Sequence, residues 1–290
     1  MLKGSFTALI TPFKDGKIDE ESFRSFIDFQ IDNGIHGVVP VGTTGESPTL
    51  SHEEHKQAVE ICIDQVNKRV PVIAGTGSNN TEEAIDLTRH AEKSGADAAL
   101  IVTPYYNKPT QRGMYEHYES ISKNSNIPII IYNIPGRSVV NMTNETMKEL
   151  FKLKNIVGVK DATADIPRVY SSRIDIGENF NLLTGDDATC LAFMLYGGHG
   201  AISVTANIAP KLCSDFMNFC LDGKFQEAAK INDLLMPLHE ALFIESSPGP
   251  VKYAANKLGL CSSEIRLPLT EISDETKKTV ERALKHASLI

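Results

Sequence analysis

The chain has 290 residues, of which 41% are hydrophobic and 23% are charged, a composition typical of a globular protein. Its formal net charge of −8 disfavours nucleic acid and an anionic membrane surface as partners. The five cysteines are scattered and odd in number, which argues against a disulfide framework or a structural zinc site and fits a reducing cytosol. Since no signal-like start and no apolar run of about 20 residues occurs, we expect a cytoplasmic protein with no membrane segment.

Short apolar runs recur at fairly even intervals along the first two thirds of the chain. Each is too short for a core helix and most are rich in Val and Ile, so they predict strands buried on both faces of a parallel sheet. The eight runs are residues 6–10, 38–41, 70–74, 98–102, 127–132, 156–159, 182–183 and 201–204.

Amphipathic segments with helix signals lie between these runs. Residues 19–33 place Phe23 and Phe26 on one face, and Ser51 with Glu54 forms a predicted capping box at the start of the next helix. Later helices are predicted at 81–93, 111–123, 145–154 and 188–196. Eight strands alternating with helices predict an α/β fold of the (β/α)₈ TIM-barrel class, with a doubly wound open sheet as the alternative.

The last part of the chain has no strand signal. From about Gly223 onward the pattern predicts three added helices, at 225–243, 251–258 and 274–287. No Gly/Ser-rich linker precedes them. We therefore predict a catalytic barrel over residues 1–223 and a C-terminal helical region over residues 224–290 that packs on the barrel.

Function in such barrels concentrates at the C-terminal ends of the strands, and one lysine stands there. Lys160 ends an apolar strand, where loss of hydration disfavours a charged ammonium group. A neutral amine in a dry pocket can attack a ketone and form an imine, which then acts as an electron sink. The alternative is a lysine that extends its amine from the strand end into water.

Other polar residues at the predicted strand ends suit the same chemistry. The phenol of Tyr132 can donate and accept protons, although a packed strand aromatic is the alternative. Thr43 and Thr44 stand between two glycines, so their amides and hydroxyls can approach a carboxylate, or the segment is simply a tight loop. Arg137 can bind a carboxylate with both arms of its guanidinium, or it is a surface arginine.

Several motifs in order, each at the end of a predicted strand, resemble one family over essentially the whole chain. That family is dihydrodipicolinate synthase, within the pyruvate-dependent class I aldolases that also include N-acetylneuraminate lyase. The motifs are GTTGES at 42–47, VTPYYNKP at 102–109, YNIPGR at 132–137, VGVKD at 157–161, TGDD at 184–187 and GAISVTAN at 200–207.

The resemblance implies a cofactor-free and metal-free lyase. In it, Lys160 forms a Schiff base with pyruvate, which then condenses with L-aspartate 4-semialdehyde to give 4-hydroxy-tetrahydrodipicolinate. This is the first committed step towards diaminopimelate and lysine. Tyr132 transfers protons in a relay with Thr43 and with Tyr106, which reaches in from a neighbouring subunit. The resemblance also implies a homotetramer built as a dimer of dimers.

The substrate-binding residues follow from the same resemblance. Thr44 holds the pyruvate carboxylate with help from the backbone around Gly185 and Ile202, and Arg137 binds the carboxylate of the semialdehyde. The nearest alternative is an aldolase for 2-keto-3-deoxy sugar acids or N-acetylneuraminate, which tends to lack an arginine at the position of Arg137. A non-catalytic pyruvate-binding barrel is a second alternative, but a binding protein has no need of a nucleophilic lysine.

Two histidines on the second predicted helix invite a metal site, which their spacing disfavours. His52 and His55 stand three residues apart, whereas the zinc motif H-E-x-x-H needs four. Through the resemblance they join a predicted L-lysine effector site, with a merely polar subunit interface as the alternative. The residues of the predicted effector site are Ser47, Pro48, His52, His55, Asn79, Glu83 and Tyr105.

Overall fold

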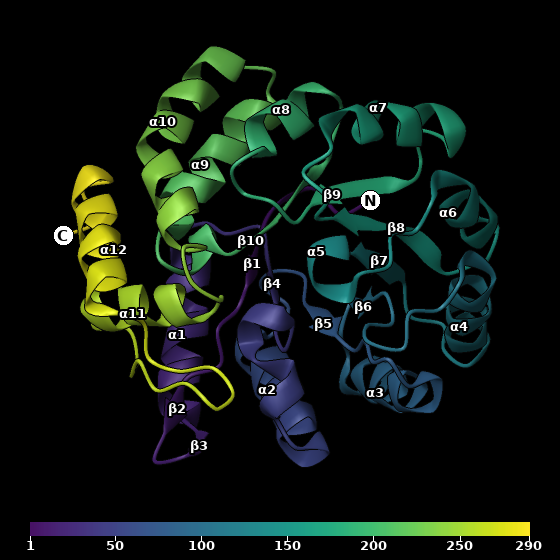
Figure 1. The fold of residues 1–290 in the computed structure, drawn as a ribbon, viewed down its shortest axis with the longest axis horizontal. Coiled ribbons are helices and arrows are strands. Elements are labelled where there is room, and N and C mark those ends of the chain that lie inside the picture. The colour runs from purple at the N-terminus through teal and green to yellow at the C-terminus, as the bar shows by residue number, and fades with distance from the viewer. The chain divides into compact units, whose positions relative to one another are not determined.

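A computed structural model describes all residues, 1–290, as two compact units. The middle unit contains residues 73–202 together with Met1–Lys3, and the terminal unit contains residues 4–72 and 203–290. The two units carry eight parallel strands that alternate with helices along the chain (Figure 1). The predicted (β/α)₈ barrel class is therefore confirmed.

The middle unit is built on consecutive parallel strands, each hydrogen-bonded to the next along the chain. These strands are β5 (Ile73–Gly75), β6 (Ala98–Val102), β7 (Ile129–Asn133), β8 (Ile156–Asp161), β9 (Asn181–Thr184) and β10 (Gly200–Ser203). Its helices are α3 (Thr81–Ser94), α4 (Gln111–Lys123), α5 (Pro135–Ser138), α6 (Asn144–Phe151), α7 (Ile166–Asp175) and α8 (Cys190–Leu195).

The core of the middle unit forms where the helices pack on these strands. Ile101 of β6 and the three isoleucines of β7 are fully buried, as expected for strands covered on both faces. Tyr118 of α4 is also fully buried, and its hydroxyl donates to the carbonyl of Ile101 at 2.6 Å. The strands are thus held rigidly up to the ends from which polar side chains project.

The terminal unit combines the two ends of the chain. Strand β1 (Gly4–Ala8) pairs in parallel with β4 (Gly37–Val39), and β2 (Phe13–Lys14) forms a short antiparallel hairpin with β3 (Lys17–Ile18). The N-terminal helices are α1 (Glu20–Asp32), η1 (Thr43–Gly45), η2 (Ser47–Thr49) and α2 (His52–Val66). The C-terminal helices are η3 (Thr205–Asn207), α9 (Pro210–Leu221), α10 (Phe225–Ala241), α11 (Gly249–Lys257) and α12 (Asp274–His286).

All eight predicted strands and the predicted capping box of Ser51 and Glu54 are confirmed. The β2–β3 hairpin, α7 and α9 were missed; both helices begin with a proline in the first turn, which we did not take as a start signal. The domain boundary at residue 223 stays a prediction. None of the helices combines the length and apolar character that a bilayer crossing would need.

Candidate active site

Lys160 lies on the second-last residue of β8, and its side chain is only 6% exposed. Its neighbour across the sheet is Tyr132 on β7, in register with it. The Lys160 Nζ atom lies 4.1 Å from the centroid of the Tyr132 ring, so the amine rests on the face of the phenol. The structure thus brings together the predicted nucleophile and the predicted proton-transfer residue, and it buries both.

Gly185 follows β9 directly and contacts the methylene chain of Lys160. A Cβ atom at this position would lie 2.7 Å from the Lys160 Cε atom and 2.9 Å from the Cβ of Ala162, closer than real contacts allow. The Gly185 amide also donates to the carbonyl of Asp161 at 2.7 Å. Gly185 therefore leaves the space that the lysine side chain occupies. Ile202, on β10, is fully buried.

Arg137 and Tyr106 lie on the segments that follow β7 and β6. Arg137 is an exposed residue of the one-turn helix α5, which ends at Val139 in a left-handed conformation. Tyr106 is 90% exposed and has a positive φ of 71°, which is uncommon for a bulky residue. The contacts described above join Lys160, Tyr132 and Gly185, while Arg137 and Tyr106 lie on the segments that follow the neighbouring strands.

Thr43 and Thr44 form the 3₁₀ turn η1 in the terminal unit. The turn closes through the amide of Gly45, which donates to the carbonyl of Gly42 at 3.0 Å. The Thr11 hydroxyl donates to the Gly45 carbonyl at 2.7 Å and fixes the turn from outside. Thr44 is buried and Thr43 half-buried, so this segment is a defined turn rather than a loose loop.

Directly after this turn stands Glu46, which sequence reasoning missed. It has a left-handed backbone, and its carboxylate is buried against Lys252 of α11, whose Nζ donates to Oε1 at 2.6 Å. The second carboxylate oxygen accepts the amide of Arg266 at 3.0 Å. Burial lowers the pKa of Lys252, while the Glu46 charge opposes that shift. Nothing in the sequence marks Lys252 as a buried partner, because its carboxylate lies 206 positions away along the chain.

The predicted effector residues divide between the units. In the middle unit, the Asn79 side-chain amide donates to the Tyr105 carbonyl at 3.2 Å, and Ser78 donates to the carboxylate of Glu83. Burial and the nearby Glu83 charge raise the pKa of Tyr105. The remaining predicted residues lie on η2 and in the first turn of α2 in the terminal unit, and they are Ser47, Pro48, His52 and His55.

No three His, Cys, Asp or Glu side chains lie close enough together to hold a metal ion. All five cysteines are buried thiols, and none forms a disulfide. Burial raises the pKa of the Cys261 thiol to about 11, which keeps it protonated and unreactive near neutral pH.

Comparisons with known proteins agree over nearly the whole chain. The model of the "Dihydrodipicolinate synthetase family" matches residues 1–287. A 4-hydroxy-tetrahydrodipicolinate synthase of Afipia carboxidovorans is 59% identical over 288 residues, which cover 99% of this chain and 97% of the relative.

Two solved structures are similar in fold. The dihydrodipicolinate synthase of Acinetobacter baumannii, in complex with pyruvate, has a TM-score of 0.98 and 46% identity and covers 100% of both chains. An enzyme of Cyanidioschyzon merolae with lysine bound has a TM-score of 0.96 and 36% identity and covers 100% of this chain and 99% of that one.

Proposed function

Because this chain belongs to the dihydrodipicolinate synthetase family, we propose that it condenses pyruvate with L-aspartate 4-semialdehyde to give 4-hydroxy-tetrahydrodipicolinate. The observation that carries the proposal is the buried Lys160 amine resting 4.1 Å from the Tyr132 ring centroid. An amine beside a proton-transferring phenol is the arrangement that imine chemistry needs, and that chemistry requires no cofactor.

The reaction follows from the chemistry of a lysine amine and a 2-keto acid. The Lys160 Nζ attacks the ketone carbon of pyruvate, and the ketone oxygen leaves as water once protonated. The imine withdraws electrons, so the methyl group loses a proton and becomes an enamine carbon. This carbon attacks the aldehyde, whose oxygen takes up a proton. The substrate's own amino group then attacks the imine carbon, closes the ring and releases Lys160.

Proton movement in these steps is assigned to three side chains. We propose that Tyr132 exchanges protons with the reacting oxygen in a relay with Thr43 and with Tyr106 of a neighbouring subunit. Tyr106 is 90% exposed, so its side chain projects from its own subunit and can reach a neighbouring one. This exposure supports the assignment of Tyr106 to the site of the neighbouring subunit. Mixing inactive Lys160→Ala and Tyr106→Phe subunits should restore activity in hybrids. No recovery in hybrids verified by mass would assign Tyr106 to its own subunit's site.

The two carboxylates of the substrates are assigned to different residues. We propose that Thr44 holds the pyruvate carboxylate with the backbone at Gly185 and Ile202. Arg137 binds the carboxylate of the semialdehyde, since a planar guanidinium matches a carboxylate fork. This assignment also separates the proposal from the sugar-acid aldolases, whose substrates present hydroxyl groups at that end.

Two measurements test the proposal together. A coupled assay with pyruvate and the semialdehyde should show condensation, and N-acetylneuraminate should not be cleaved. Borohydride added with pyruvate should reduce one imine per chain, located on Lys160 by mass spectrometry, and Lys160→Ala should lose this adduct while staying folded. An active wild type with no adduct, or with an adduct on another lysine, would contradict the imine mechanism.

We propose a homotetramer, arranged as a dimer of dimers, in the cytoplasm. Exposed apolar side chains on α7 and at the C-terminal end of α8 support self-association: Tyr170, Ile174, Leu195 and Tyr196. The five cysteine thiols, none of which forms a disulfide, fit a reducing compartment. Sedimentation should give four chains for the wild type and fewer for Ile174→Lys; a monomeric wild type would contradict the assembly.

We also propose that L-lysine binds outside the pyruvate site and inhibits partially. Glu83 can pair with the α-ammonium group, and Asn79 and Tyr105, which already contact each other, can meet the α-carboxylate. Ser47, Pro48, His52 and His55 would receive the side chain. Calorimetry should show lysine binding to wild type and much weaker binding to Glu83→Ala. No heat and no inhibition at millimolar lysine would contradict this effector site.

A further inference from the structure

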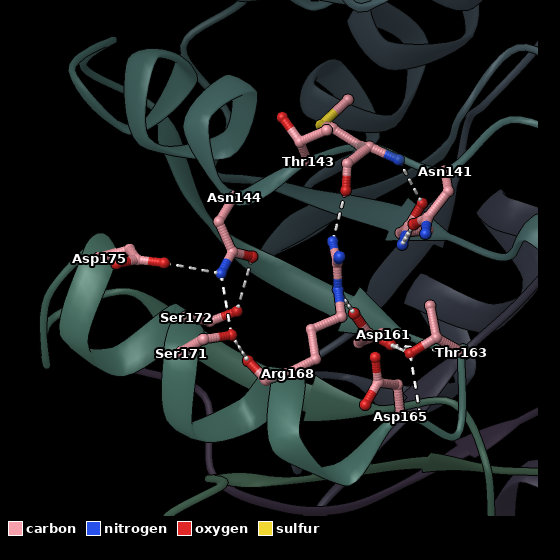
Figure 2. A network of polar contacts seen from close by, with 12 residues as sticks. Asn141, Thr143, Asn144, Asp161, Thr163, Asp165, Arg168, Ser171, Ser172 and Asp175 are labelled. Atoms are coloured by element: carbon pink, nitrogen blue, oxygen red, sulfur yellow. Dashed lines mark hydrogen bonds and ion pairs between the residues drawn. The ribbon is translucent and has the colours of Figure 1, made fainter.

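A polar network behind Lys160 is centred on Arg168 of α7 (Figure 2). The Arg168 Nε donates to the Asp161 carboxylate at 2.7 Å, and its Nη2 donates to the carbonyl of Met142. Both side chains of the ion pair are largely buried, with 13% and 11% exposure. One planar guanidinium therefore joins the end of β8 to the segment between α5 and α6.

The Asp161 end of this bridge adjoins the reacting lysine. Asp161 follows Lys160 on β8, and successive side chains of a strand point to opposite faces. Its second carboxylate oxygen accepts the amide of Thr163 at 2.9 Å and also the Thr163 hydroxyl. Its backbone carbonyl accepts the amide of Gly185, the residue that contacts Lys160. The position of Asp161 thus fixes the backbone on both sides of the lysine side chain.

At the Met142 end of the bridge, side chains form hydrogen bonds with the backbone amides and carbonyls of residues 141–143. The amide of Met142 donates to Asn133 Oδ1 at 3.0 Å, and the Asn133 amide group donates to the Asn141 side chain at 2.8 Å. Gln111 donates to the Asn141 carbonyl at 2.8 Å and accepts the amide of Thr143 at 3.1 Å. Asn133 is itself the neighbour of Tyr132 on β7.

This segment begins two residues after Arg137. Helix α5, which contains Arg137, is one turn long and ends at Val139, so it has little internal hydrogen bonding to fix its direction. The Ser138 hydroxyl, with one hydrogen to donate, lies 2.9 Å from the Ile134 carbonyl and 3.1 Å from the Val140 carbonyl, so it stands between α5 and the held segment. The contacts that hold residues 141–143 therefore also hold the orientation of α5. They set the direction from which the Arg137 side chain approaches the substrate.

We infer that Arg168 is a positioning residue, which ties the strand end bearing Lys160 to the segment that follows Arg137 and so sets the place of the semialdehyde carboxylate relative to the enamine. This inference rests on the proposed function for the identity of that substrate. A lysine at position 168 keeps the charge beside Asp161 but has a single donor group, which cannot span both partners as the fork does. The positioning role therefore depends on the guanidinium contacting both partners, rather than on its positive charge.

Arg168→Lys tests the inference, with Arg89→Lys as the matched control. Arg89 also spans two acceptors, the carbonyl and side chain of Asn124, but it joins α3 to the end of α4, away from residues 139–143. In Arg168→Lys, borohydride trapping of pyruvate should stay within about twofold of wild type. The KM for the semialdehyde should rise about ten- to a hundredfold, because even a small misplacement of a substrate has an effect of about that size. Arg89→Lys should change neither.

Amide hydrogen exchange gives a second readout that does not depend on turnover. Residues 139–143 should exchange faster in Arg168→Lys than in wild type or Arg89→Lys, because the Met142 carbonyl has lost its donor. Unchanged exchange, or equal losses in trapping and in semialdehyde use, would overturn the inference. If Arg168→Lys does not fold, Asp161→Asn combined with Arg168→Gln removes both charges together and is read in the same way.

Failure of the proposed function and failure of the positioning role of Arg168 give different results. A wild type that does not condense pyruvate with the semialdehyde contradicts the proposed function. Unchanged exchange of residues 139–143 in a folded Arg168→Lys contradicts the positioning role, whatever the substrate is.

Discussion

At the scale of single residues, the lysine to which we assign the imine depends on the space that its neighbours leave as much as on the contacts that they provide. Tyr132 gives Lys160 an aromatic face, and Gly185 gives it the space for its methylene chain. Both conditions come from strands on either side of β8, since Tyr132 is in register with Lys160 and Gly185 follows β9. The position of the amine is therefore set by three adjacent strands of one rigid unit.

Gly185→Ala should slow imine formation strongly. The added methyl group would lie 2.7 Å from the Lys160 Cε atom, so the lysine side chain must move away from its place over Tyr132. We expect the rate of borohydride trapping with pyruvate to fall about tenfold or more, in line with the cost of misplacing a reacting group. Gly136→Ala is the control, because its new Cβ would meet nothing within 4 Å. Equal trapping rates in the two variants would contradict this reading.

Arg137→Ala should separate the two substrates. The variant would lose the bidentate contact that we assign to the carboxylate of the semialdehyde, so kcat/KM for that substrate should fall about a hundredfold or more. Trapping of pyruvate on Lys160 should stay close to wild type. Parallel losses in both measurements would show that Arg137 supports the fold instead.

Sequence analysis identified residues that are unusual at the end of a strand, Lys160 and Tyr132. It missed Arg168, whose contacts depend on residues that only the fold brings close. Lys160 and Tyr132 could be predicted because a lysine or tyrosine that ends a Val- and Ile-rich strand is unusual. Arg168 could not, because its role depends on Met142 and Asp161 meeting the same guanidinium plane. Only the folded backbone establishes that meeting.

At the scale of elements, the strands could be predicted better than the helices around them. A parallel strand buried on both faces is a continuous apolar run, and all eight such runs were found. Helix α9 buries one face, which contains Cys213, Phe216 and Met217, but the apolar residues Leu212, Phe219 and Leu221 interrupt its opposite face. Its pattern therefore lacks the clear polar face that identifies an amphipathic helix. Helix α4 was predicted with its correct bounds, although its buried polar residue was not.

That residue, His117, should make the stability of the protein depend on pH. Burial lowers its pKa from 6.5 to about 4, so the folded state resists a proton that the unfolded chain accepts. The stabilisation is present above pH 6.5 and is lost as the pH falls from 6.5 to 4, by about 3 kcal/mol in total. Its Nδ1 is paired with the Thr81 hydroxyl at 2.9 Å, and its Nε2 is buried without a partner.

Urea unfolding of His117→Gln across this pH range checks the prediction. The variant's free energy of unfolding should fall less than that of wild type between pH 6.5 and 4, at a fixed protein concentration. His286→Gln, which changes an exposed histidine of α12, should keep the wild-type slope. Identical slopes in all three proteins would mean that His117 gains its proton without cost.

At the scale of the whole molecule, the C-terminal part of the chain contacts the turn that contains the first motif, GTTGES at 42–47. The buried carboxylate of Glu46, next to Thr43 and Thr44, has its counter-ion in Lys252 of α11. Phe13 lies beside both cations of this cluster, 4.2 Å from the Lys252 Nζ and 4.3 Å from the Arg266 Cζ. The C-terminal helices therefore stabilise the turn to which we assign the pyruvate carboxylate.

Lys252→Met should destabilise the protein by about 3–5 kcal/mol, because it leaves a buried carboxylate without its cation. Glu46→Gln in the same chain should recover much of that loss, since no charge then remains buried. Urea unfolding of the two single variants and the double variant gives the coupling between the residues. Additive losses in the double variant would show that the two groups act independently.

The ion pair of Glu46 and Lys252 also bears on how the chain folds while it is being made. The two residues are 206 positions apart, which corresponds to about 10–40 s of synthesis at about 5–20 residues per second. Throughout that interval the Glu46 carboxylate has not yet met the cation that compensates its burial, so we expect it to stay hydrated. The middle unit, residues 73–202, leaves the ribosome complete in the meantime. We therefore expect a nascent chain to contain Lys160 early, and to complete the ion pair beside the turn to which we assign the pyruvate carboxylate only near the end of translation.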